Sequence, residues 1–228
     1  EQKTAIGVQV LQATTSMYGT GLGFQALLSN TSGAGNTAVG HSAMRTNTTG
    51  QYNVAAGYSA LYSNTTGEYN TAMGLSAMLR NTTGDNNVAI GRTALEENTT
   101  TDGNVAIGYE AGDSYSGGSY NTFIGYGTDV PGSGYTNATA IGNGAIVNSS
   151  NKIRMGNTSI TSFESQVSLS VSSDKRLKKD IEDINYGLET VLKMRPVSYE
   201  LKRNELKQVG FVAQDMQKLV PEVVTGIE

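Results

Sequence analysis

The stretch SSDKRLKKD, residues 172–180, brings together side chains that could do covalent chemistry. Ser172 and Ser173 precede four cations within residues 175–179. A serine hydroxyl is a weak nucleophile unless a base takes its proton, and a lysine acts as that base only when it is neutral. Nearby positive charges lower the pKa of a lysine and so favour its neutral form. On its own, such a run is more often a solvated helix start or a charged linker, so the residue types alone do not establish this chemistry.

The composition of the chain changes at this stretch. Before Ser173 charged residues are sparse and glycines frequent, whereas after it these proportions invert. The chain has no cysteine, which excludes disulfides and thiolate metal sites, and we expect no metal and no cofactor. Its net charge of -4 argues against nucleic-acid binding. No apolar run is long enough to span a membrane and the N-terminus has no signal-peptide pattern, so we expect neither membrane insertion nor a signal peptide.

The part of the chain before Ser173 is a repeat with a period of 17 residues. Glycine recurs at this spacing at Gly23, Gly40, Gly57, Gly74, Gly91, Gly108, Gly125 and Gly142. The unit is clearest in NNVAIGRTALEENTT, residues 86–100. We predict two short extended pieces in each unit, one like NVAIG and one like TALEE, separated by NTTG turns. Such units must stack to bury apolar side chains, which predicts a coil of β-structure.

Two neighbouring positions of the strand-like piece differ in side-chain size: one is large and apolar, and the other is alanine. We predict that the larger side chains form the core column, which comprises Val39, Met73, Ile90, Ile107, Ile124 and Ile141. We predict that the alternate alanines face a neighbouring subunit that approaches closely, at Ala38, Ala55, Ala72, Ala89, Ala106 and Ala140. The sequence therefore predicts a homo-oligomeric shaft, with a homotrimer as the preferred state. After Gly112 the unit degrades, and Phe123 stands where alanine is expected, so we expect the shaft to loosen or to change its cross-section there.

The part after Ser173 predicts a small α+β module. Apolar residues from Ile181 to Leu192 follow helical spacing, and Pro196 ends that helix. Residues 197–201 alternate as a strand, residues 207–214 offer a second strand, and QDMQKLV predicts a final short helix with Asp215 as a candidate cap.

Two resemblances to known families follow from these residues. The unit N-T/V-A-V/I-G-x-x-A-L/M resembles the head repeats of trimeric autotransporter adhesins and repeats of phage tail fibres. The blocks SDKRLKKDI, GLETVLKMRPVSYE and VGFVAQDMQKLVPEVV resemble the autoproteolytic intramolecular chaperone domain of phage tail spikes and fibres. That resemblance implies a domain that trimerises, guides folding of the preceding fibre and then releases itself. It also leads us to expect more helical sequence after Val224 than this chain contains.

The chaperone resemblance also implies the site residues. Its pattern Ser-Asp-x-Arg-x-Lys falls on Ser173, Asp174, Arg176 and Lys178, with Ser173 and Lys178 as a catalytic dyad. The nucleophile would attack the carbonyl of Ser172, so the cleavage site is the Ser172–Ser173 bond. Each chain would be cut once, and no activity in trans is expected. Asp174 and Arg176 are supporting residues whose roles stay open.

We therefore predict a mainly β protein with three parts. Residues 1–144 form a trimeric stacked β-coil shaft of the β-roll or β-solenoid kind, residues 145–172 a β-stranded connector, and residues 173–228 the chaperone domain. The predicted function is the distal part of a phage tail fibre or spike, assembled in the host cytoplasm and carried on the virion. Its partners would be two further copies of the chain and a host cell-surface receptor, with a glycan as one candidate.

Two other functions were weighed against this one. A trimeric bacterial surface adhesin would carry residues 173–228 as a cap that does not cleave. The chaperone domain also occurs in a membrane-bound animal transcription factor, which would need a basic DNA-binding domain and a transmembrane helix.

Other candidate residues carry weaker signals. His41, the only histidine, is interpreted as a surface residue, and the NTT and NTS sequences as turns rather than glycosylation sites. Glu96 and Glu97 do not form a convincing carboxylate pair for glycoside cleavage. A carbohydrate-contacting stripe of tyrosines stays open beside a plain solvent-facing role, at Tyr52, Tyr58, Tyr62, Tyr69 and Tyr109.

Overall fold

The computed structural model describes residues 2–13, 15, 18–114, 117–163, 186–200 and 207–221. It forms two compact units, Glu1–Ile160 and Thr161–Glu228. Each unit is described by itself.

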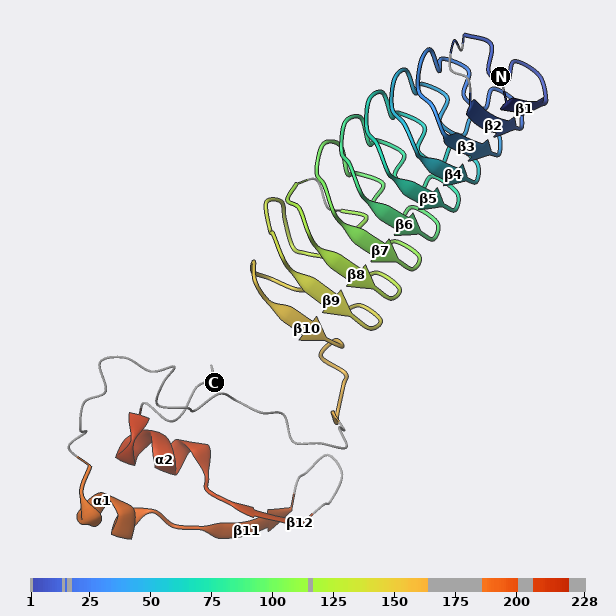
Figure 1. Ribbon diagram of the computed structural model, residues 1–228. Helices are drawn as coiled ribbons and strands as arrows, with labels where there is room; N and C mark the ends of the chain where they lie inside the picture. The colour runs from blue at the N-terminus through green and yellow to red at the C-terminus, as the bar shows by residue number, and fades with distance from the viewer. Residues whose placement is uncertain are drawn as a thin grey trace. The chain divides into compact units, whose positions relative to one another are not determined.

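The first unit is a β-solenoid whose ten strands form one parallel sheet in chain order (Figure 1). The strands are β1 (Gln2–Ile6), β2 (Tyr18–Leu22), β3 (Asn36–Val39), β4 (Val54–Ala56), β5 (Thr71–Met73), β6 (Val88–Ile90), β7 (Val105–Ile107), β8 (Thr122–Ile124), β9 (Thr139–Ile141) and β10 (Ile153–Met155). The register places equivalent repeat residues side by side, for example Ala89 beside Ala106. The predicted β-coil is thereby confirmed.

The second extended piece predicted in each coil is absent, and the TALEE prediction is wrong in this respect. Within that segment Thr93 and Leu95 have φ angles of 54° and 50°, in the left-handed region. Ala94 and Leu95 are adjacent and both fully buried, whereas neighbouring residues of a strand point to opposite faces. The segment is therefore a bend that closes the coil. Its backbone still bonds to the adjacent coil, with the Leu95 N–H donating to the Ala111 carbonyl at 3.0 Å.

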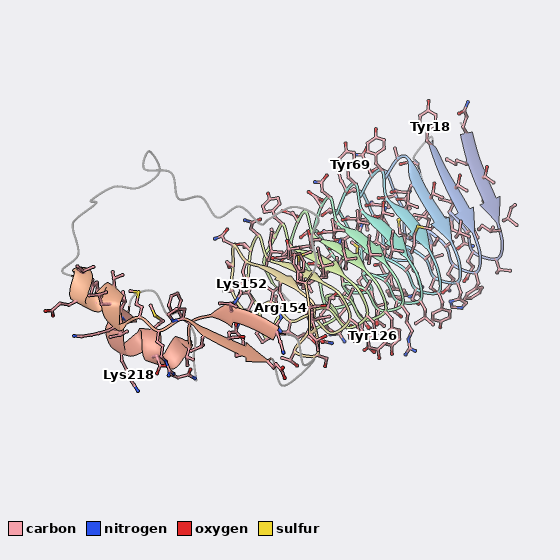
Figure 2. All side chains as sticks on the ribbon, turned by 90° about the horizontal axis from the view of Figure 1, so that it is seen from below. Tyr18, Tyr69, Tyr126, Lys152, Arg154 and Lys218 are labelled. Carbon is pink, nitrogen blue, oxygen red and sulfur yellow. The ribbon has the colours of Figure 1, made fainter. Side chains whose placement is uncertain are left out.

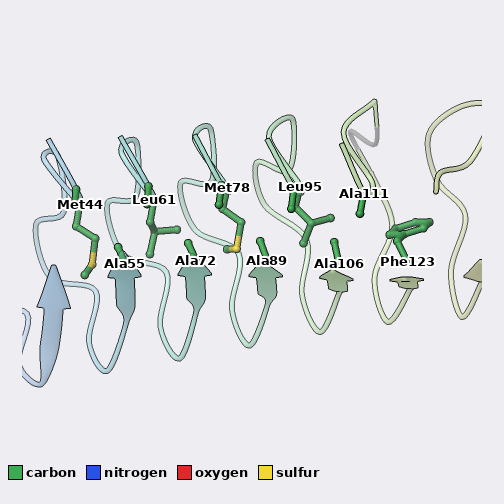
Figure 3. Packing of buried hydrophobic residues seen from close by; sticks show 14 of the residues in the cluster. Met44, Ala55, Leu61, Ala72, Met78, Ala89, Leu95, Ala106, Ala111 and Phe123 are labelled. Atoms are coloured by element: carbon green, nitrogen blue, oxygen red, sulfur yellow. The ribbon is translucent and has the colours of Figure 1, made fainter. Parts of the chain in front are cut away.

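The core lies on the opposite side of the strands from the one predicted. The alanines of the predicted subunit contact are fully buried, as Ala89 and Ala106 exemplify, whereas Ile90 and Ile107 of the predicted core are each 38% exposed. Long side chains from the opposite wall, among them Leu61 and Leu95, fill the space above the alanines (Figure 3). A coil of this size leaves room for only one large apolar side chain between its walls, so the strand contributes the small one.

Past Gly112 the solenoid continues without loosening, and what changes is the packing inside the coil. Phe123 lies in β8, pairs with Ala106, and is fully buried. Gly112 occupies the position that Leu95 holds in the preceding coil, and a Cβ atom added to Gly112 would lie 2.9 Å from the Phe123 ring. The large residue has moved from one wall of the coil to the other, and the coil remains filled.

Buried asparagines join the coils in two ladders. In the first, the Asn47 side-chain amide donates to Asn30 Oδ1 at 2.7 Å, and Asn64 donates to Asn47 in the same way. In the second, the backbone N–H of Asn53 donates to Asn36 Oδ1 at 2.9 Å. These bonds satisfy polar groups that would otherwise be buried without a partner.

The second unit is a small α+β module, as predicted. Helix α1 (Leu188–Lys193) is followed by the antiparallel pair β11 (Val197–Glu200) and β12 (Lys207–Gly210), and then by α2 (Ala213–Leu219). Val212 is the N-cap of α2, and Asp215 lies in its first turn rather than at the cap. In the described residues no helix is long and apolar enough to cross a membrane.

Candidate functional site

The predicted catalytic residues lie outside the described residues. This applies to Ser173 and Lys178, to the supporting Asp174 and Arg176, and to Ser172 at the predicted cleavage bond. Their roles, and the boundaries at residues 144 and 172, stay predictions. In the second unit the structure describes residues 161–163, 186–200 and 207–221, and the last two of these ranges follow the undescribed segment in the chain.

The described part of the second unit exposes apolar side chains on several elements. Leu188 and Leu192 of α1 are 73% and 75% exposed, and Val209 of β12 is 79% exposed. The closest ion pairs of its described residues are loose, with Arg195 and Asp215 at 3.9 Å. The described module therefore has little core of its own.

The first unit presents an apolar sheet face. The side chains after the buried alanines point outward on successive strands, and Val39, Ile90 and Ile107 are 37–38% exposed. The side chains before the alanines share this face, including Val54. These side chains form a row across β2–β8, which we call the outward column and which comprises Leu22, Val39, Ala56, Met73, Ile90, Ile107 and Ile124.

The tyrosines do not form the single stripe considered from the sequence. Tyr52 and Tyr69 stack just before their strands, with ring centroids 5.2 Å apart. Tyr109 and Tyr126 stack just after theirs at 5.1 Å, and Figure 2 shows Tyr69 and Tyr126 at opposite edges of the solenoid. Tyr62 lies in the bend and accepts a hydrogen bond from Arg45. Because stacked rings cover each other's faces, these columns offer edges and hydroxyls rather than open ring faces.

His41 belongs to one of these surface columns, as predicted for a surface residue. Its ring lies between Phe24 and Tyr58, at centroid distances of 5.0 and 4.8 Å. Nδ1 of His41 lies 3.0 Å from the Ser42 hydroxyl. The histidine therefore packs as an aromatic member of the column.

The glycosylation-like sequences are structural. The asparagines at their first positions, including Asn30, Asn64 and Asn98, are fully or almost fully buried in the ladder. Their side chains also donate to the carbonyl of the residue three positions later, as Asn64 does to Gly67 at 2.9 Å. This confirms the interpretation of these sequences as turns.

Acidic residues gather around Asp113. Burial, reinforced by the charges of Glu96, Glu110 and Asp129, raises the pKa of Asp113 to about 6. Burial also raises the pKa of Asp129, whose carboxylate accepts from the N–H groups of Val130 and Ser114. Glu97 is paired with Arg80 at 2.9 Å. No group of three or more metal-binding side chains occurs among the described residues.

One residue that sequence reasoning missed is Arg154. It occupies the middle of β10 beside Ala140, where the other coils place an alanine, Gly21 or Phe123. The sequence signal for this residue is an arginine at a position that holds small or apolar residues in the other coils. It is hard to see because the last coil has 14 residues between paired strands, so a search at the period of 17 does not align Arg154 with Ala140.

The comparison with family models finds one match, at residues 173–225, to the peptidase S74 family, described as chaperone of endosialidase. The searches of curated proteins and of solved structures returned no match to this chain. The chain is thus tail-fibre-like in organisation, with a β-solenoid followed by a segment similar to a self-cleaving, peptidase-type chaperone domain.

Proposed function

We propose that this chain is the distal part of a phage tail fibre or spike that attaches the virion to its host. Its C-terminal segment would promote trimerisation and folding of the solenoid and then release itself. The observation that carries this proposal is the match of residues 173–225 to a chaperone family directly behind a repetitive β-solenoid. The fibre would be assembled in the host cytoplasm and then carried on the virion.

The proposed release is a single intramolecular cleavage. The Ser173 hydroxyl attacks the carbonyl carbon of Ser172 while Lys178 takes the hydroxyl proton. An ester forms between the Ser172 acyl group and Ser173 Oγ, and the peptide C–N bond breaks as its nitrogen gains a proton. Water then hydrolyses the ester. Proximity favours the first step because nucleophile and carbonyl are neighbours in one chain.

Intact mass of the freshly expressed chain tests this step. The parent should yield fragments 1–172 and 173–228, whereas Ser173→Ala and Lys178→Ala should stay whole. Matched controls are Ser172→Ala and Lys179→Ala, which retain the proposed dyad and should still split. A folded parent that stays whole, or cleavage that persists in Ser173→Ala, would refute the mechanism.

We also propose that the outward column is the trimer interface. It is an exposed apolar row on successive strands, and soluble monomers rarely expose large contiguous apolar patches. A second copy of the chain has the same spacing along its whole length, so each coil can meet an equivalent coil. This replaces the alanine contact predicted from the sequence, because the alanines are buried inside each chain.

Sedimentation of the full chain tests the interface. The parent should be a trimer, and Ile90→Glu with Ile107→Glu should give a folded monomer. The matched control is Thr66→Glu with Thr83→Glu, which places the same charges at exposed turn positions and should remain trimeric. A monomeric parent would contradict the proposal, as would a trimer that tolerates both glutamates in the outward column.

Attachment itself is tested by adsorption. Labelled cleaved protein should bind a subset of strains in a panel of bacteria, and it should compete with itself. Uniform or absent binding across the panel would count against host attachment.

A further inference from the structure

The inward column of the solenoid ends in a charged residue. In the preceding strands this position is filled by Ala106, Phe123 and Ala140, all fully buried. In β10 it is filled by Arg154, which is half-buried, while its neighbours Ile153 and Met155 are exposed. Partial burial of a guanidinium is costly unless the group finds hydrogen-bonding partners.

The hydrogen bond of Arg154 uses Nε and leaves the two terminal nitrogens of the guanidinium able to bind a ligand. Nε donates to the Gly156 carbonyl at 3.0 Å, which fixes the plane of the guanidinium. The two terminal nitrogens have no hydrogen bond or ion pair to any residue that the structure describes. Such a pair of N–H donors matches the two oxygens of a carboxylate.

Arg154 lines an open pocket of about 490 Å³ at the last coils of the solenoid, and Figure 2 labels it beside Lys152. The lining combines amides and a hydroxyl with apolar and backbone surface: Pro131, Gly144, Ile146, Asn148, Asn157 and Thr158. Two of the amides are held in place. Lys152 Nζ donates to Asn148 Oδ1 at 2.9 Å, and the Asn157 amide donates to the Asn143 carbonyl at 2.8 Å.

The segment that supplies the pocket lining, residues 130–163, has a net charge of the opposite sign to that of the shaft before it. Lys152 and Arg154 are the charged residues of the segment 130–163, which contains no acid, whereas residues 18–129 carry an excess of acids. Fixed positive charge in a concave site attracts anions.

We propose that this pocket binds a sugar residue that bears a carboxylate, of the sialic or uronic acid class. Arg154 would take the carboxylate, while Asn148, Asn157 and Thr158 would bond the ring hydroxyls. Pro131 and Ile146 would contact the apolar face of the ring, and the volume lies in the range of small-molecule sites. The inference deepens the proposed attachment function, on which it rests, by naming the ligand class.

Calorimetry with the full chain tests the pocket, using the methyl glycosides of N-acetylneuraminic acid and glucuronic acid. At least one should bind, and Arg154→Gln should weaken that binding at least tenfold. The matched control is Arg80→Gln, which removes the same charge from an exposed ion pair and should leave binding unchanged. Neutral methyl glucoside should bind at least tenfold more weakly. Absent binding, equal binding by Arg154→Gln, or equally tight binding of inorganic phosphate would overturn the proposal.

A second variant separates binding from folding. Arg154→Lys keeps the charge but loses the fork of donors, so it should fold with an unchanged circular dichroism spectrum and still bind more weakly. If Arg154→Gln does not fold, Arg154→Lys alone decides, and full binding by this variant would overturn the proposal.

Cell adsorption distinguishes failure of the pocket from failure of attachment. If the parent binds neither glycoside but adsorbs to cells, the pocket inference is wrong and attachment stands. If the sugar binds through Arg154 but no cell is adsorbed, the pocket stands and the attachment function fails.

Discussion

Asn64 illustrates how single residues hold neighbouring coils together. Its amide nitrogen donates to Asn47 Oδ1 at 2.7 Å and to the Gly67 carbonyl at 2.9 Å. Its oxygen accepts from the Asn81 amide at 2.9 Å. The side chain is fully buried, so water cannot replace these partners. One residue therefore connects three successive coils.

We predict that Asn64→Ala lowers the free energy of unfolding by about 2–4 kcal/mol, because it leaves buried donors and acceptors without partners. Thr66→Ala in the same turn is the control, since Thr66 is exposed, and its effect should stay within about 0.5 kcal/mol. Urea unfolding of both variants measures the difference. Equal stability of the two would show that the ladder contributes little.

Because its pKa is raised in the folded chain, Asp113 should make the free energy of unfolding depend on pH. Burial and the neighbouring acids raise its pKa to about 6 in the folded chain from 3.8. The folded form therefore binds the proton more tightly, and stability falls as pH rises from 3.8 to about 6. Because Asp113 is partly solvent-screened, we expect Asp113→Asn to be more stable than the parent by only about 1 kcal/mol at pH 7. Unfolding curves at pH 3.5 and pH 7 check this, and an advantage of the variant that grows on acidification would contradict it.

The strand shows what the repeat pattern can and cannot predict. The recurrence of Asn87, Ala89 and Gly91 in most coils predicts the strand, its register and the stacking. The alternation of Ala89 and Ile90 says only that two faces differ. Which face is inside depends on the width of the coil, and the opposing Leu95 fills that width. A general preference for burying the larger residue therefore gave the wrong face.

The bend of each coil was less predictable than its strand. Leu95 and Met78 adopt left-handed backbone angles, which a sequence normally signals with glycine or asparagine. Here the hydrogen bonds to the adjacent coils and the burial of these side chains overcome the local preference. The pocket at Arg154 was missed because it depends on the register of the last coil, whereas the dyad at Ser173 and Lys178 comes from a family pattern and stays a prediction.

Phe123 and Gly112 allow the packing of one coil to be tested as a unit. Phe123→Ala should cost about 3–5 kcal/mol, because it leaves a cavity beside Gly112. Gly112→Leu alone should also destabilise, since its side chain would meet the Phe123 ring. Leu95 adopts a φ of 50° at the equivalent position and Gly112 has a φ of 62°, so a leucine fits this backbone.

The double variant should therefore recover most of the lost stability, because it restores the pattern of the other coils. Urea unfolding of the parent, both single variants and the double variant gives the coupling free energy. Additive losses would mean that the two residues do not share one space.

The solenoid as a whole is a stack in which each strand pairs only with the strands before and after it. Stability in such a repeat protein is approximately a sum of coil and nearest-neighbour contributions. Every column, from the asparagine ladders to the buried alanines, repeats at one spacing between β2 and β9. If 17 residues are deleted, the two ends that are joined occupy equivalent positions in the repeat, and every column stays in register. If another number of residues is deleted, the columns on the two sides of the deletion no longer match.

We predict that deletion of residues 71–87, one period of 17 residues, leaves a folded solenoid. Asn70 would then precede Val88 as Asn87 does now, and Leu61 would lie beside Leu95 in the buried column. The circular dichroism signal per residue should be unchanged, and the unfolding midpoint should fall by a few degrees. Deletion of residues 71–78 is the control: it places buried alanines and outward side chains out of register, so this variant should be largely unfolded. If both deletions unfold alike, specific coils rather than the shared spacing hold the shaft together; if both fold alike, the columns do not set the register.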